Sequence, residues 1–568
     1  MGKTIRIRLI AIALVIVFCV MAVRLYSLQI IKGESYKSQA DRQYVSAPIN
    51  TFDRGTIYLK SKDGTEVSGA TLSSGYYLAM VPKDIVEPED LYNLLSPIVN
   101  LKEDDFLKKA GKKDDPFEEI IHNISVEQAG KISALKENAL RLYKEKWRFY
   151  PFNSLSAQSI GFVAYEKDKL TGRYGLERTY ESLLSRDMDS TKVNFFADVF
   201  LNLKENIFDN SAKGDLVTSL EPAVQGYLEK TLASIHTKYQ SKTTGGIIIN
   251  PQNGEIYSLG SVPNFDLNQF SKVADSSVYI NPLVERVYEM GSVIKPLTMS
   301  AGIDSGAITE QSRYNDTGSV TYNGKKISNH DKIARGDSSM QDILNHSLNV
   351  GASWIMEKMG TENFSKYFLS FGIDKKTGID LPNETSGLVS NLKSNRLIEH
   401  ATASYGQGIA MSPIATVRAL STLANGGKLI TPHIGTEMKL RSGITKKIEY
   451  PEPIQVLKKE TTDIVTKMLI EAVDTSLQSG KVKLDNYTIA AKTGTAQIAD
   501  NSSGGYYEDK FLHSFFGYFP ARNPQFLVFL YMVEPKGVQY ASDTLTNSFM
   551  DITKFLLHYY EVAPDRNI

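Results

Sequence analysis

Residues 245–259 read Gly-Gly-Ile-Ile-Ile-Asn-Pro-Gln-Asn-Gly-Glu-Ile-Tyr-Ser-Leu, two apolar runs separated by a turn-forming stretch. Ile and Tyr favour strands, whereas Asn, Pro and Gly favour the tight connection between strands. The pattern therefore predicts a β-hairpin. Three further strands are predicted much later in the chain, at 487–491, 513–519 and 526–533.

The residues between the hairpin and the late strands have mainly helical apolar spacing, for example at 341–358 and 413–424. A sheet that begins with a hairpin, ends with three late strands and is interrupted by helices is an α+β fold. Residues 215–220 resemble a strand, and Pro222 suits the first turn of a following helix. We therefore place the start of this domain at residue 213 and its end near residue 562.

Composition excludes several classes of protein. The chain has 568 residues, of which 64 are basic and 64 acidic, so its formal net charge is zero. This balance argues against nucleic-acid binding, which needs an excess of Lys and Arg. The single cysteine, Cys19, excludes a disulfide framework. The eight histidines show no close pair with ligand spacing, so we expect neither a metal site nor a cofactor.

One apolar stretch lies near the N-terminus. Residues 9–23, LIAIALVIVFCVMAV, carry no charge, and Lys3, Arg6 and Arg8 precede them. The stretch is short for a membrane span, but the apolar pattern resumes after Arg24, a side chain long enough to reach the interface. Since basic residues favour the cytoplasmic side, this arrangement predicts an N-terminus in the cytoplasm.

Two other interpretations of this stretch are less consistent with the sequence. A cleaved signal peptide needs an A-x-A-like site, and none follows the apolar run. A lipoprotein signal at Cys19 is disfavoured by the bulky Phe18 before it. We predict a cytoplasmic tail over 1–8, an uncleaved transmembrane anchor over 9–31, and the rest of the chain outside the cytoplasm.

Residues 32–212 show no catalytic constellation. Asp53-Arg54-Gly55-Thr56-Ile57 resembles a turn that leads into a strand, and Lys62-Asp63-Gly64-Thr65 contains a hairpin-type Asp-Gly. Residues 84–147 are rich in Lys, Asp and Glu, with helical apolar spacing. A structural or docking domain is the interpretation that these features favour.

The candidate chemistry begins at Ser292. In Met290-Gly291-Ser292-Val293-Ile294-Lys295, we expect the serine in the first turn of a helix and Lys295 one turn further on the same face. A serine hydroxyl needs a nearby base to act as a nucleophile. Lysine serves as that base only when burial or a neighbouring cation lowers its pKa.

Two later segments complete the candidate site. Ser347-Leu348-Asn349 lies inside an apolar helical stretch, where unbonded polar groups are costly. Lys492-Thr493-Gly494-Thr495 follows the predicted strand 487–491, and we expect Gly494 to leave room for a ligand at the strand edge. Similar short patterns occur at Ser133–Lys136, Ser390–Lys393 and Lys376–Gly378, which we interpret as chance matches in polar helical or loop contexts.

The ordered set Ser292-x-x-Lys295, Ser347-x-Asn349 and Lys492-Thr493-Gly494 resembles the three motifs of penicillin-binding proteins and serine β-lactamases. Arg54-Gly55, Gly175-Leu176-Glu177 and residues 404–413 and 513–524 are also similar to segments of class B penicillin-binding proteins. The resemblance implies a transmembrane helix, an elongated pedestal (dimerisation-type) domain over 32–212 and a transpeptidase domain over 213–562.

The resemblance also implies a role for each residue. Ser292 attacks the carbonyl between the two D-alanines that end a peptidoglycan stem peptide, and Lys295 takes its proton. Ser347 relays protons, and Asn349 orients Lys295 and the substrate. Lys492, Thr493 and Thr495 bind the terminal carboxylate beside Gly494, and the N–H groups of Ser292 and Thr495 form the oxyanion hole. β-Lactams would acylate the same serine.

Several alternatives remain open at this point. They are a membrane-anchored serine β-lactamase, a D,D-carboxypeptidase and a non-catalytic penicillin-binding sensor. A bifunctional class A protein is disfavoured, because residues 32–210 show neither the Glu-Asp pair followed by Phe and His nor the Gln-rich helix of a glycosyltransferase domain. The resemblance further implies a membrane glycosyltransferase of the SEDS type as partner, in cell division or elongation.

Overall fold

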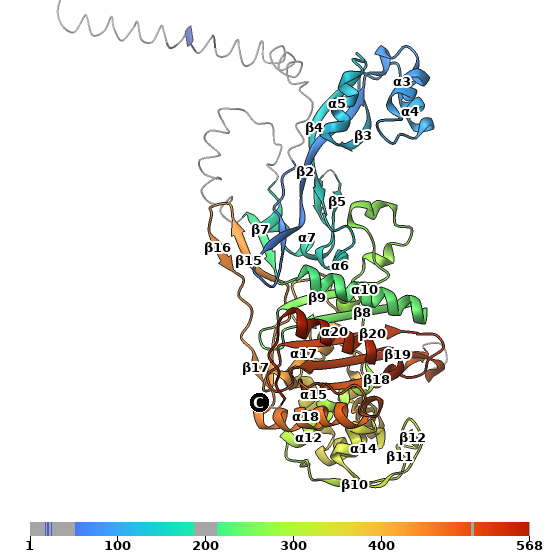
Figure 1. Ribbon diagram of the computed structural model, residues 1–568, viewed down its shortest axis with the longest axis vertical. Coiled ribbons are helices and arrows are strands. Elements are labelled where there is room, and N and C mark those ends of the chain that lie inside the picture. Colours follow the sequence, from blue (N-terminus) through green and yellow to red (C-terminus); the bar gives the residue numbers. More distant parts are fainter. Residues whose placement is uncertain are drawn as a thin grey trace, which may run out of the picture. The chain divides into compact units, whose positions relative to one another are not determined.

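Figure 1 shows the computed structural model of the protein. Apart from single positions near the N-terminus, it describes residues 52–167, 169–186, 213–500 and 505–566. The predicted anchor over 9–31 lies outside these ranges. Within them, no helix combines the length and the apolar character needed to cross a membrane. The described residues form two compact units, one of Phe52 and 73–147, the other of 53–72 and the residues from 148 onward.

The smaller unit packs short helices against antiparallel strands. Leu78, Met80, Leu95, Phe106 and Ile132 are among the residues that form its apolar core. The second half of β2 pairs with β3 and β4. The elements are β2 (Glu66–Met80), α3 (Pro88–Leu95), α4 (Glu103–Ala110), β3 (Glu118–Ile124), α5 (Val126–Ala134) and β4 (Leu140–Phe149).

The larger unit contains the predicted interrupted sheet. Its five strands run in the order β18-β19-β20-β8-β9, and neighbouring strands are antiparallel. In Figure 1 they follow one another from β9 down to β18. The α+β prediction is confirmed. The strands are β8 (Thr243–Ile249), β9 (Ile256–Val262), β18 (Ala490–Asp500), β19 (Gly505–Phe519) and β20 (Phe526–Val533).

Both faces of this sheet are buried, which explains why β20 is apolar throughout. Ile248 and Val528 pack with α10 (Pro222–Tyr239) and α20 (Thr546–Tyr559) on one face. Ile247 and Phe529 pack in the main core with the helical insertion on the other face. Since side chains alternate along a strand, a strand covered on both faces reads as a continuous apolar run.

A second sheet in this unit joins early and late parts of the chain. β7 (Gly214–Thr218) pairs in parallel with β1 (Ile57–Lys60) and antiparallel with β15 (Gly435–Leu440). The other strands are the first half of β2 and β16 (Thr445–Lys447). The turn predicted before β1 is not present, because Arg54 forms an isolated bridge with Ser185. Arg54 is buried, with its Nε 2.6 Å from the Glu177 carboxylate.

The helical insertion carries most of the remaining elements. They are α11 (Pro282–Glu285), α12 (Lys295–Asp304), β10 (Arg313–Asp316), β11 (Ser319–Tyr322), β12 (Lys325–Ser328), β13 (Gly336–Ser339), α13 (Met340–Asn345), α14 (Asn349–Met359), α15 (Thr361–Ser370), α16 (Leu397–Ala403), α17 (Pro413–Ala424) and α18 (Lys459–Glu471). In Figure 1, α12, α14 and β10 lie beyond β18, whereas α17 lies at the level of β19 and β20. Short elements elsewhere in the unit are α6 (Ala157–Ile160), β5 (Val163–Glu166), β6 (Lys169–Gly172), α7 (Gly175–Thr179), α8 (Glu181–Leu184), β14 (Lys428–Leu429), β17 (Ile454–Gln455) and α19 (Ala541–Thr544).

Two predicted elements have different bounds. The helix predicted over 341–358 is two helices, α13 and α14, with a break at His346–Leu348. The strand predicted over 487–491 begins only at Ala490. Thr488 is instead held by the C-terminal segment, since its N–H donates to the Asp565 carboxylate at 2.6 Å.

Candidate active site

Ser292 lies in a 3-10 helix, η6 (Gly291–Ile294), that leads directly into α12 at Lys295. Gly291 has φ +64°, and its N–H donates to the Gly406 carbonyl at 3.1 Å. Gly406 has φ +80°, and a Cβ there would lie 2.2 Å from the Gly291 oxygen. The glycine at each position therefore lets the two backbones contact directly and fixes the turn that carries Ser292.

Lys295 is buried and fully hydrogen-bonded. Its Nζ donates to the Ser347 carbonyl at 2.5 Å, to Ser347 Oγ at 3.1 Å and to Asn349 Oδ1 at 2.8 Å. These three bonds match the three donors of a charged ammonium. A neutral lysine has only two donors and a lone pair. Loss of one proton therefore frees one position on Nζ as an acceptor for a neighbouring hydroxyl.

Ser347 lies in the break between α13 and α14, where it has φ +52°. The helical spacing at 341–358 did not indicate this break, at which the left-handed backbone ends the helical path. The break turns both the carbonyl and the Oγ of Ser347 toward Lys295. Lys492 Nζ also donates to Ser347 Oγ at 3.1 Å, so the hydroxyl is shared by two lysines.

Asn349 is oriented by groups that the sequence did not single out. Its Nδ2 donates to the Ser328 carbonyl at 2.9 Å. The neighbouring Asn329 is buried, its Oδ1 accepts from Val350 N at 3.1 Å, and its Nδ2 donates to the Asp316 carboxylate at 3.0 Å. The loop after β12 is thereby tied to the start of α14. The only sequence signal was a run of polar residues between short strands.

Both lysines have a pKa below the ordinary value, so a larger fraction of each is neutral and able to accept a proton at neutral pH. Burial, and next the positive charge of Lys492, hold the pKa of Lys295 well below its ordinary value. Burial lowers the pKa of Lys492 to about 7. Two interacting lysines titrate as a coupled pair, in which one neutral and one charged group share the site near pH 7.

β18 supplies the third set of predicted residues. It is an edge strand, since its only partner in the five-stranded sheet is β19. Lys492, Thr493 and Thr495 all line the cavity described below. Gly494 does not. A Cβ at Gly494 would lie 2.7 Å from the Met290 oxygen and 3.0 Å from Val293 N. The space we expected to be left for a ligand is therefore occupied by the backbone around Ser292.

A cavity of about 940 Å³ brings the predicted residues together. Ser292, Ser347 and Asn349 from the insertion line it, as do Lys492, Thr493 and Thr495 from β18. Lys295 contacts two of these residues from below the surface. Residues of the similar short patterns at 133–136, 376–378 and 390–393 do not line it. Thr377 and Gly378 instead donate their N–H groups to the Glu384 carboxylate.

Gln539 and Tyr540 of the loop after β20, and Ser542 of α19, form part of the cavity wall. The Ala541 N–H donates to Thr495 Oγ1 at 3.0 Å. His513, on the neighbouring strand, is fully buried, with Nε2 3.0 Å from the Gln539 carbonyl and Nδ1 2.9 Å from Thr544 Oγ1. Burial lowers the pKa of His513 to about 4, so the imidazole is a neutral bridge that fixes this loop.

Within the described ranges, no group of three or more His, Cys, Asp or Glu side chains is placed to hold a metal ion. The residues that line the cavity are instead suited to acyl transfer. They combine a serine at a helix start, a buried lysine of lowered pKa, a second hydroxyl and an exposed strand edge.

Comparison with known proteins identifies the family. The family model "Penicillin binding protein transpeptidase domain" matches residues 244–554, more than half of the chain. The chain belongs to the penicillin-binding protein transpeptidase family. The model "Penicillin-binding Protein dimerisation domain" matches residues 52–199. The two domains together make the chain a class B penicillin-binding protein, as its motifs indicated.

Individual proteins agree with this assignment. Stage V sporulation protein D of Bacillus subtilis is 30% identical over 99% of this chain and 87% of its own length. A probable peptidoglycan D,D-transpeptidase, PenA, of Neisseria gonorrhoeae is 27% identical over 94% and 89%. Penicillin-binding protein 2X of Streptococcus thermophilus has a similar fold, with a TM-score of 0.71 at 19% identity, covering 90% of this chain and 80% of its own.

Proposed function

We propose that this protein is a peptidoglycan D,D-transpeptidase that acts through an acyl-enzyme on Ser292. Ser292 attacks the carbonyl between the two terminal D-alanines of a stem peptide, and D-alanine leaves. An amine of a neighbouring strand then attacks the ester and forms a cross-link. The observation that carries the proposal is the Ser347 hydroxyl, which lies 3.1 Å from both Lys295 Nζ and Lys492 Nζ in the cavity that Ser292 lines.

Proton transfer follows from these contacts. When Lys295 is neutral, its free lone pair accepts the Ser292 proton as the hydroxyl attacks. The proton then passes through Ser347, which contacts both lysines, to the departing amine of D-alanine. Asn349 keeps Lys295 in place through its Oδ1. A general base of this kind contributes about 10² to 10⁴ in rate.

Substrate recognition uses β18. An extended stem peptide pairs with the exposed edge of this strand, and Lys492, Thr493 and Thr495 bind its terminal carboxylate. The N–H groups of Ser292 and Thr495 stabilise the oxyanion, and removing one such donor typically costs about 10²–10³ in rate. β-Lactams acylate the same serine. A related penicillin-binding protein 3 from Mycobacterium tuberculosis, with a TM-score of 0.69, has been crystallised with aztreonam.

The cellular setting is part of the proposal. Residues 1–8 remain in the cytoplasm, residues 9–31 anchor the chain in the inner membrane, and residues 32–212 form an elongated pedestal. The transpeptidase domain, residues 213–562, then acts outside the cytoplasm. A SEDS-type glycosyltransferase is the proposed membrane partner, contacting the anchor and the pedestal. The family matches over 52–199 and 244–554 support this division of the chain.

Labelled penicillin tests the proposal. The full chain in detergent is incubated with the drug, and the adduct is located by peptide mass. We expect a stable adduct on Ser292 that is lost in Ser292→Ala and retained in Ser390→Ala, the matched control from the similar pattern at 390–393. No adduct, or an adduct that survives Ser292→Ala, would sink the proposal, and rapid release of hydrolysed drug would indicate a β-lactamase.

A further inference from the structure

His330 lines the same cavity as Ser292 but has no part in the mechanism above. It lies in the loop between β12 and β13, directly after the buried Asn329. The hydrogen bonds of Asn329 to Asp316 and Val350 fix the backbone at this point. The His330 ring is exposed to the cavity and makes no hydrogen bond with any described residue. Its nitrogens are therefore free for a ligand.

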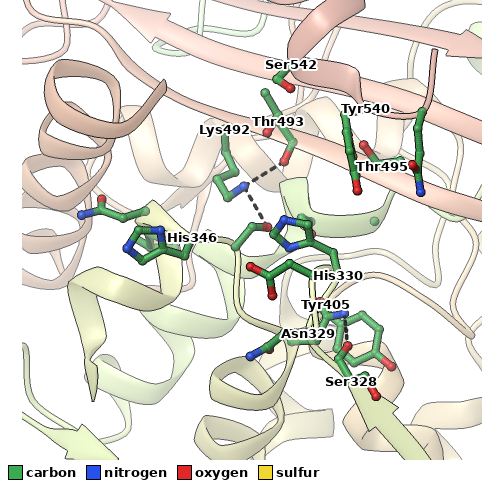
Figure 2. Close-up of a pocket in the computed structure, with 18 of the residues that line it drawn as sticks. Ser328, Asn329, His330, His346, Tyr405, Lys492, Thr493, Thr495, Tyr540 and Ser542 are labelled. Carbon is green, nitrogen blue, oxygen red and sulfur yellow. Dashed lines mark hydrogen bonds between the residues drawn. The ribbon is translucent and has the colours of Figure 1, made fainter. Parts of the chain in front are cut away.

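The opposite wall faces this ring. Tyr540, from the loop after β20, lies with its ring centroid 5.9 Å from that of His330 at an interplanar angle of 78°. Figure 2 shows the two side chains approaching each other from opposite sides of the cavity, with Lys492 beside them. His330 therefore lies where the insertion meets the loop after β20, next to the lysines that carry the acyl-transfer chemistry.

Attack of the acceptor amine on the acyl-enzyme needs a base that formation of the acyl-enzyme does not need. A lysine-type acceptor amine has a pKa of about 10.4, so it enters as an ammonium at neutral pH. An ammonium has no lone pair and cannot attack the ester. In the acyl-enzyme, neutral Lys295 can take only one proton, the one that the attacking nitrogen loses as the new bond forms. The first proton of the ammonium needs another acceptor.

We propose that His330 is the general base that takes this first proton from the acceptor ammonium. The inference rests on the proposed transpeptidase function and identifies a catalytic residue for its second step. The proton moves from the acceptor nitrogen to a free ring nitrogen of His330 and then to cavity water. The neutral amine attacks the ester carbonyl, its second proton passes to Lys295, and Lys295 returns that proton to Ser292 Oγ as the ester bond breaks.

The charges around His330 favour this role. Burial, and the cations Lys295, Lys492 and Arg335, lower the pKa of His330, whereas Asp331 opposes them, so the ring is neutral at pH 7. Arg335 keeps Asp331 ionised through a contact of 2.5 Å. A positive charge on Lys492 lowers the pKa of the acceptor ammonium once it is inside, which makes transfer to His330 feasible.

The test compares two acceptors on a preformed acyl-enzyme. The full chain is acylated with a thioester of an acyl-D-alanine, so that the rate of acylation does not enter. Aminolysis is then measured with Nα-acetyl-D-lysine, an ammonium at pH 7, and with hydroxylamine, which is neutral. The variants are His330→Gln, His330→Asn and, as matched control, His346→Gln, another histidine that lines the cavity.

In both His330 variants we expect aminolysis by the lysine derivative to fall about 10²-fold, the lower end of the range for one general base. Aminolysis by hydroxylamine should change less than about threefold. In the variants, the rate of aminolysis by the lysine derivative should rise about tenfold per pH unit, because only its free amine reacts. The inference would be overturned if both acceptors lost the same factor in aminolysis rate, so that the ratio of the two rates did not change. It would also be overturned if His346→Gln showed the same loss with the lysine derivative. Failure to form an acyl-enzyme on Ser292 would instead refute the proposed function.

Discussion

Replacing Lys492 by Met should move the acid limb of the acylation rate to higher pH. Each lysine Nζ lies 3.1 Å from Ser347 Oγ, so the two nitrogens are at most about 6 Å apart. Two unit charges at that distance repel by about 3 kcal/mol at an effective dielectric constant of about 20, which equals about two pKa units. Methionine has a similar length and no charge.

The sign follows from the role of Lys295 as a base. Burial and Lys492 hold the pKa of Lys295 low, so that its neutral form is present near pH 7. Without the charge of Lys492, this repulsion is absent and the pKa of Lys295 rises. Less neutral lysine is then present at any pH below that value, and acylation is slower there but recovers as the pH is raised.

The assay is the second-order rate of acylation by a fluorescent penicillin between about pH 5 and pH 10. The midpoint of the acid limb reports the pKa of Lys295, whereas the plateau reports all other effects of the substitution. Lys492→Arg is the control, because it keeps a cation and should keep the midpoint. A midpoint in Lys492→Met within about half a pH unit of the wild type would refute the coupling and leave Lys492 a substrate-binding role alone.

Three further outcomes are expected. Gly494→Ala should destabilise the protein by about 1–3 kcal/mol, measured by thermal unfolding, and slow acylation, because its Cβ would lie 2.3 Å from Ser514 Oγ and displace the turn that carries Ser292. Glu177→Gln should cost about 3–5 kcal/mol in urea unfolding, since the buried carboxylate holds Arg54 and Arg148, each at 2.6 Å. Burial alone would raise the pKa of Glu177, but the two arginines lower it, so the wild type should lose this stability as the pH falls through that lowered pKa while the variant does not. Thr495→Val should slow acylation and Thr495→Ser should preserve it, because only the serine keeps the hydroxyl that accepts from Ala541 N.

The sequence predicted those features that depend on local pattern. The apolar run 526–533 is β20, Pro222 is the first residue of α10, and the three short motifs converge on one cavity. These predictions succeed because strand propensity, helix capping and the spacing of chemically unusual residues are properties of neighbouring positions. The order of the three motifs along the chain was the signal that predicted the site.

Features that depend on distant partners were not predictable. The break at Ser347 exists because its carbonyl and hydroxyl bond to Lys295, a residue from another helix. The late start of β18 reflects the bond between Thr488 and Asp565, near the C-terminus. Gly494 looked like a space for a ligand, since nothing in its own segment shows that Met290 approaches it. His330 had no motif at all, because its importance comes only from its position opposite Tyr540.

The sheet that contains β7 limits how the protein can be divided. β7 opens the part of the chain assigned to transpeptidation, yet both of its neighbours come from elsewhere, β1 from residues 57–60 and β15 from residues 435–440. A fragment cut at residue 213 would leave one edge of β7 without a partner, and exposed strand edges promote aggregation. Excision of a soluble catalytic fragment therefore requires residues 53–72 to be retained. The catalytic domain depends on strands that come from the N-terminal part of the chain.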